Sequence, residues 1–167
     1  MTWVTGLANG DTDWDRFATT FPAPFEALAT LVRAAWDTTD PVLLELARLR
    51  IARLLGNARE LSLRSARAAV AGLTEDKLAE LAQWPTSPLY DARERACLAF
   101  TEQFVIDANG IDQAMVTAVS DHLGGPGTYA FTQAVSALET FQRACLTLGI
   151  ETGPGIEAMI AATGASS

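Results

Sequence analysis

The chain has 167 residues, of which 49% are hydrophobic and 19% are charged, and its formal net charge is -8 with an isoelectric point near 4.5. This length favours one domain with its own core, and the apolar content excludes an intrinsically disordered chain. The acidic balance argues against a nucleic-acid partner, and neither a membrane-spanning run nor a basic amphipathic face for anionic lipid is visible. No basic residue precedes Arg16 and no apolar block follows the first methionine, so we expect no secretory signal and a cytoplasmic protein.

Apolar residues recur at helical spacing through most of the chain, and Gly, Pro and Asn separate the periodic segments. This pattern predicts an all-α fold, a compact bundle of about seven helices whose long apolar members leave surface for subunit contacts. A loop is expected at 84–90, which contains two prolines, and fraying of the tail is expected beyond Met159. The expected helices, in chain order, cover residues 24–36, 41–56, 58–71, 74–81, 91–106, 111–123 and 128–148.

The stretch LLGNARELSLR, residues 54–64, has two interpretations. Gly56 can end one helix, Asn57 is a good N-cap for the next, and Glu60 lies where it can complete a capping box. Glu60 and Arg64 would then form an i,i+4 pair, and the cap and the pair together would stabilise the helix by about 1–2 kcal/mol. On one continuous helix Asn57, Glu60 and Arg64 also share a face within roughly 60° of arc, so they could instead line a binding site.

Glu45 and His122 are further candidates for chemistry, and Arg64 has a specific role within the site. Glu45 lies among leucines of the helix that Pro41 opens, where it is either a solvated first-turn carboxylate or a buried proton donor and acceptor. Arg64 is the arginine of the 48–67 segment that best fits a substrate carboxylate, because it shares the face of Asn57. His122, at a helix end before two glycines, is typical of a solvated residue, and a substrate-binding role is the alternative.

The sulfur and imidazole groups argue against two kinds of site. Cys97 and Cys145 lie far apart in the sequence, with no second thiol or histidine at ligand spacing, and are predicted to be small buried helix residues rather than a redox pair. His122 is the only histidine, so a metal site with two imidazoles cannot form within one chain. Nothing in the sequence requires a metal or another cofactor, and we expect none.

Several short motifs occur between residues 45 and 104: LRIA at 49–52, AGLT at 71–74, SPL at 87–89 shortly after Trp84, and RERA at 93–96. With these motifs the segment resembles the core of the carboxymuconolactone decarboxylase and alkylhydroperoxidase D-like (AhpD-like) superfamily. A weaker match continues to about Gly149. We therefore expect a single AhpD-like domain over residues 1–167, with a family core at about 41–149 and a flexible tail at about 160–167.

The resemblance implies an all-helical fold, a pocket near the start of the third expected helix, and assembly into dimers, trimers or hexamers. Redox members of the superfamily carry a glutamate, a Cys-x-x-Cys pair and a histidine. The glutamate position is Glu45 here, but the two cysteine positions hold Asn57 and Glu60, and the histidine position holds Arg64. Because peroxide reduction of this kind requires a thiolate, we expect no thiol peroxidase activity, although the family name would suggest it.

Two functional hypotheses remain open at this point. The first is a cofactor-free enzyme of the lyase or isomerase type acting on a small organic acid, a lactone or an enolisable carbonyl compound. In it Glu45 or Glu60 would move the proton, Arg64 would hold an anionic group and Asn57 would hydrogen-bond a developing oxyanion. The second is a non-catalytic member of the family that binds a ligand or serves as an oligomeric scaffold, its site sealed by the helix cap.

Overall fold

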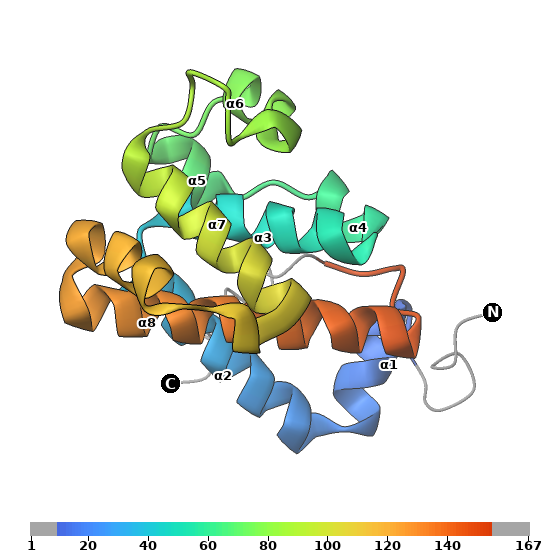
Figure 1. Ribbon diagram of the computed structural model, residues 1–167. Coiled ribbons are helices and arrows are strands. Elements are labelled where there is room, and N and C mark those ends of the chain that lie inside the picture. The colour runs from blue at the N-terminus through green and yellow to red at the C-terminus, as the bar shows by residue number, and fades with distance from the viewer. Residues whose placement is uncertain (1–9, 155–167) are drawn as a thin grey trace.

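The computed structural model describes residues 10–154, and within that range every regular element is a helix, which confirms the all-α prediction. The short helical segments between residues 66 and 83 lie at the top of the view, and the long helices are packed together below them (Figure 1). In chain order the elements are α1 (Asp13–Thr20), α2 (Pro22–Thr38), α3 (Pro41–Leu55), α4 (Ala58–Ser62), α5 (Ala66–Val70), α6 (Glu75–Ala79), the 3-10 helix η2 (Leu81–Gln83), α7 (Ala92–Asp107), the 3-10 helix η3 (Ala108–Gly110) and α8 (Gln113–Leu148).

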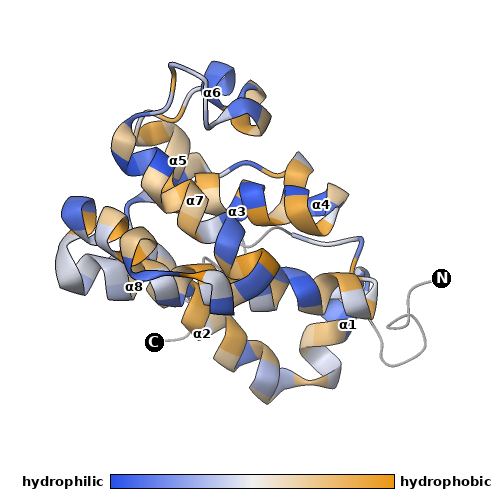
Figure 2. Ribbon diagram, in the orientation of Figure 1, coloured by the Kyte–Doolittle hydropathy of each residue, from blue (hydrophilic) through white to orange (hydrophobic). Residues whose placement is uncertain are grey.

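The core is built around α3 and α8. Helix α8 packs against α2, α3 and α7, and α3 also packs against α7. As a result α3 is buried without interruption from Leu43 to Leu49, more than the single apolar stripe of a surface helix. Hydrophilic stretches are nevertheless visible in α3 at the centre of the molecule (Figure 2). Glu45 and Arg48 are among the buried residues of α3, so burial of this helix places charged side chains in the interior.

The expected single helix over residues 58–71 is wrong. The structure has two short helices there, α4 and α5, separated by an extended backbone at Leu63 with φ -86° and ψ 152°. Ser65 begins α5, and its side-chain oxygen accepts a hydrogen bond from the N–H of Ala68 at 3.2 Å. At this break, backbone groups lack the hydrogen-bond partners that a continuous helix would provide, and they bond instead to side chains of the site described below.

Other boundaries differ in smaller ways. Helix α1 was not expected, although Thr12 and Asp15 form a capping box at its start. The helices expected at 111–123 and 128–148 both lie within α8, and the predicted break between them is present, because the backbone at Gly124 is not helical, with φ 68° and ψ 172°. Gly56 ends α3 as predicted, with φ 69°. The expected fraying beyond Met159 lies outside the described residues, and within 10–154 no helix is both long and apolar enough to cross a bilayer.

Candidate functional site

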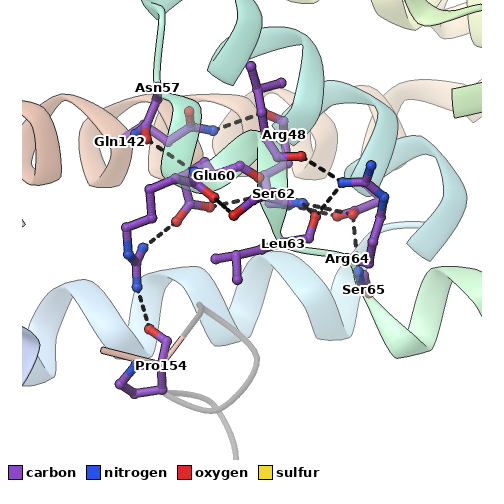
Figure 3. A network of polar contacts seen from close by, with 12 residues as sticks. Arg48, Asn57, Glu60, Ser62, Leu63, Arg64, Ser65, Gln142 and Pro154 are labelled. Atoms are coloured by element: carbon purple, nitrogen blue, oxygen red, sulfur yellow. Dashed lines mark hydrogen bonds and ion pairs between the residues drawn. The ribbon is translucent and has the colours of Figure 1, made fainter. Parts of the chain in front are cut away.

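Arg48 lies at the centre of a buried ion-pair network (Figure 3). Its Nε and Nη2 atoms donate to the two carboxylate oxygens of Glu45 at 2.7 and 2.8 Å. Its Nη1 donates to Oε2 and to the backbone oxygen of Glu60 at 2.9 and 2.8 Å, and Nη2 also donates to the backbone oxygen of Leu63 at 3.0 Å. All the N–H groups of the guanidinium are therefore used. The side chain of Arg48 is 2% exposed and those of Glu45 and Glu60 are 0% exposed.

The local fold explains this geometry. Glu45 and Arg48 are three residues apart on α3 and so lie on the same side of the helix. The break between α4 and α5 presents the carbonyls of Glu60 and Leu63 to Arg48, and it directs the N–H of Ser65 to Oε1 of Glu45 at 3.1 Å. Desolvation by burial lowers the pKa of Arg48, but the hydrogen bonds and charges of Glu45 and Glu60 outweigh it, so the pKa is raised above its ordinary value.

A second arginine completes the charge balance. Arg59 donates from Nη1 to Oε1 of Glu60 at 2.6 Å, so two guanidinium groups face two carboxylates. The guanidinium of Arg59 also lies over the ring of Trp14, 6.0 Å from its centroid. Its Nη2 donates to the backbone oxygens of Gly153 and Pro154 at 3.2 and 2.6 Å. Arg59 thus joins the network to α1 and to the segment that follows α8.

Asn57 connects the network to a hollow of about 380 Å³. Its Oδ1 accepts the N–H of Glu60 at 3.1 Å, as the N-cap of α4, and this bond fixes the orientation of the amide. The side chain is 3% exposed, and its Nδ2 has no hydrogen-bond partner within the described residues. The hollow is lined by residues 56–59 on one side and by Cys145, Leu146 and residues 149–151 on the other. Asn57 therefore combines a place in the lining of this hollow with a buried N–H donor that has no partner in the described part of the chain.

A second, much smaller hollow lies beside Glu45. Its volume is about 20 Å³, and its lining includes Glu45, Arg64, Ser65 and Glu75. A polar hollow of this size has room for about one water molecule. Of the two glutamates that bind Arg48, Glu45 lines this small hollow, whereas Glu60 lines neither of these two hollows.

The structure brings together Glu45, Asn57 and Glu60 as the sequence suggests, but not Arg64. The prediction that Arg64 shares a helical face with Asn57 and Glu60 is wrong, because α4 ends at Ser62. The side chain of Arg64 is 46% exposed, caps the carbonyls of Leu61 and Leu63, and lies 3.8 Å from Glu75 instead of pairing with Glu60. The expected capping box is only half formed, since the Glu60 carboxylate binds arginines rather than the N–H of the cap.

His122 is exposed on α8 just before the kink at Gly124 and lines neither hollow. Sequence reasoning did not single out Arg48 and Arg59 among the arginines of the 48–67 segment as the partners of Glu45 and Glu60, and it missed Gln142. Gln142, 0% exposed on α8, donates from Nε2 to the backbone oxygen of Arg48 at 2.9 Å. One signal for Arg48 was available: it lies three residues after Glu45 within an apolar segment, where an unpaired charge would be costly.

Both cysteines are free and buried, Cys97 on α7 and Cys145 on α8, as predicted. Burial, as the largest cause, raises the pKa of each thiol to about 12. At neutral pH both are therefore protonated and poor nucleophiles. Among residues 10–154 no group of three or more His, Cys, Asp or Glu side chains is arranged to hold a metal ion.

Comparisons with known proteins agree with this fold. Residues 20–103 match the model of the carboxymuconolactone decarboxylase family. The structure is similar to the crystal structure of a protein of unknown function from Agrobacterium tumefaciens, described as a candidate antioxidant defence protein AhpD, with a TM-score of 0.74 and 20% identity over 83% of this chain and 97% of that chain. No curated protein gives a significant match. Since the family model spans half of the sequence, from the end of α1 to α7, the chain belongs to the carboxymuconolactone decarboxylase family.

Proposed function

We propose that this chain is a thiol-independent member of its family that binds a small carbonyl compound, such as a lactone or an enolisable ketone, in the hollow beside Asn57. The observation that carries the proposal is Asn57, which lines a hollow of about 380 Å³ and whose buried amide is held by its cap bond but leaves Nδ2 unpaired within the described residues. A buried N–H donor without a partner costs about 1–3 kcal/mol, and a carbonyl oxygen would satisfy it.

The choice of asparagine supports a binding role. Ser, Asp and Asn are about equally good N-caps, because each supplies an oxygen that accepts the first free backbone N–H groups. Only asparagine has, in addition, an amide N–H₂ that the cap does not use. Capping alone therefore does not explain the unpaired donor of Asn57.

The charges around the hollow favour an uncharged ligand over an anion. Arg59, the cation in the lining, already binds Glu60 and the carbonyls of Gly153 and Pro154. Glu151 adds a negative charge to the same lining. The anionic ligand expected from the sequence depended on Arg64, which does not line this hollow.

The test is a titration of the isotope-labelled protein followed by NMR. The panel contains γ-butyrolactone, cyclohexanone and succinate, and the signals are the side-chain amide of Asn57 and the backbone amides of Leu146 and Ile150. We expect saturable shifts with the lactone or the ketone and none with succinate. Asn57→Ser keeps the cap but lacks the N–H₂ group, so the shifts of Leu146 and Ile150 should disappear while the melting temperature stays close to that of the wild type. Shifts that persist in the serine variant, or saturation by succinate alone, would refute the proposal.

A cofactor-free acid/base enzyme is the second candidate, and the contact of Glu45 with the small hollow favours it. A water molecule held there could exchange a proton with this otherwise buried carboxylate. The oxygens of Glu60, in contrast, are directed at Arg48 and Arg59. If a compound of the panel is turned over, Glu45→Gln should abolish turnover. Unchanged turnover in the folded Gln variant would rule out proton transfer by Glu45.

Thiol peroxidase chemistry is not part of the proposal. The two family positions for reactive cysteines hold Asn57 and Glu60, which cannot form a thiolate or a disulfide. The remaining thiols, Cys97 and Cys145, are buried with the pKa of each raised to about 12. Assembly of this chain into a dimer, trimer or hexamer remains a prediction, which analytical ultracentrifugation would test.

A further inference from the structure

Residues 149–154, which we call the C-terminal wall, follow α8, and the first three of them line the hollow beside Asn57. Gly149 ends α8 in a left-handed conformation with φ 66° and turns the chain back towards α4 and α1 (Figure 1). The N–H of Ile150 donates to the backbone oxygen of Cys145 at 2.9 Å. Ile150 is buried in the same apolar cluster as Cys145 and Trp14, and Glu151 lines the hollow. Cys145 and the first residues of the wall thus line the same hollow.

Asp13, the first residue of α1, holds this wall. Its Oδ2 accepts the backbone N–H groups of Glu151 and Thr152 at 3.1 and 3.0 Å and the hydroxyl of Thr152 at 2.9 Å. In return the N–H of Asp13 donates to the hydroxyl oxygen of Thr152 at 3.0 Å, and the N–H of Trp14 donates to the carbonyl of Thr152 at 3.2 Å. The Asp13 side chain is 5% exposed, so these bonds are shielded from water. Together they join two ends of the described chain.

Gly153 permits the close approach of the wall to α1. Its φ is 120°, a conformation that L-residues rarely adopt. A Cβ atom at this position would lie 2.4 Å from the Cβ of Trp14. On the other side of the wall, Arg59 holds the carbonyls of Gly153 and Pro154. Position 153 therefore requires glycine both for its backbone conformation and for space.

We propose that Asp13 is a positioning residue for the hollow: it keeps the C-terminal wall in place over Cys145 and Asn57, and release of the wall opens the hollow to solvent. The contact between α1 and the wall therefore controls access to the buried amide of Asn57. The consequence for a carbonyl ligand rests on the proposed function, whereas the movement of the wall can be measured without any ligand.

The experiment measures alkylation of the two native cysteines by iodoacetamide at mildly alkaline pH, quantified for each thiol by peptide mass spectrometry. Cys145 reports on the hollow, and Cys97, buried on α7 and absent from the lining of the hollow, reports on general loosening of the fold. The variants are Asp13→Ala, which removes the acceptor, and Gly153→Ala, which displaces the wall without changing a charge. Asp11→Asn, at an exposed aspartate two residues earlier, is the matched control.

Each hydrogen bond that holds the wall should contribute about a factor of five to the equilibrium constant between the held and the released wall. Disruption of several of these bonds should therefore make Cys145 react at least about ten-fold faster in both test variants. The Cys97 rate should stay unchanged, and Asp11→Asn should behave as the wild type. A Cys145 rate that is unchanged in both variants would overturn the proposal, as would a parallel rise at Cys97 and Cys145. Because no ligand is used, failure here is distinct from failure of the Asn57 titration, in which binding itself would be absent.

Discussion

Replacing Arg48 with methionine would leave two buried carboxylates without their shared cation. Methionine fills much of the space of the arginine stem, so the cost comes mainly from the lost hydrogen bonds and from the stranded charges of Glu45 and Glu60, each 0% exposed. Removing one partner of a buried ion pair costs about 3–5 kcal/mol. Because all the N–H groups of Arg48 are bonded, we expect a loss of free energy of unfolding within this range.

Urea denaturation followed by circular dichroism measures this loss. With a slope of about 2 kcal/mol per molar urea, the midpoint should fall by roughly 1.5–2.5 M. Arg64→Met is the matched control, since Arg64 is half-exposed and its nearest carboxylate oxygen, in Glu75, is 3.8 Å away, and it should cost no more than about 1 kcal/mol. Adding Glu45→Gln to Arg48→Met should recover part of the loss, because one stranded charge is removed. Equal midpoints for Arg48→Met and Arg64→Met would refute the reasoning.

Three further outcomes are expected. Gly56→Ala should lower the free energy of unfolding by about 1–2 kcal/mol in thermal melts, because φ is 69° and the added Cβ meets no atom within 4 Å, and a neutral result would contradict a purely conformational cost. Stability should fall as pH rises from 9 towards 12, because burial raises the pKa of Cys97 and Cys145 from 9.0 to about 12 and the unfolded chain loses these protons first. The contribution of the two protonated thiols to the free energy of unfolding is complete below pH 9, and above pH 9 each thiol lowers that free energy by up to about 1.4 kcal/mol per pH unit. Replacing both cysteines with alanine should therefore flatten the dependence of the free energy of unfolding on pH, measured by urea titration. Wild type and the same double variant should consume hydroperoxide with a dithiol at equal rates, and a rate abolished only in the variant would show that a thiol reacts.

The helix boundary at residues 56 and 57 could be predicted because its determinants are local. Gly56 tolerates positive φ and Asn57 caps the next helix, and both roles depend only on neighbouring backbone groups. The break at Leu63 could not be predicted in this way, since the residues around it continue a helical pattern. There the carbonyls of Glu60 and Leu63 are bonded to Arg48, 12 and 15 residues earlier in the chain. A tertiary requirement overrides the local preference at this position.

The candidate site was predicted in part. Asn57 and Glu60 were identified from their spacing, and Glu45 from the apolar residues around it, but the partner chosen for them was Arg64. Arg48 and Arg64 are chemically the same, and only burial separates them: one is 2% exposed and the other 46%. Which of the two meets Glu60 depends on the path of the chain after Ser62.

The sequence by itself determined the all-α class, the main helices and the cap at Asn57. These features follow from side-chain chemistry and from interactions within one or two helical turns. The tertiary structure alone decided which charges are buried together, which hollow the Asn57 amide lines, and that α1 meets the segment after α8. Burial and ion pairing depend on distances between elements that are remote in the sequence, and tertiary packing, such as that of α3 against α7 and α8, sets those distances.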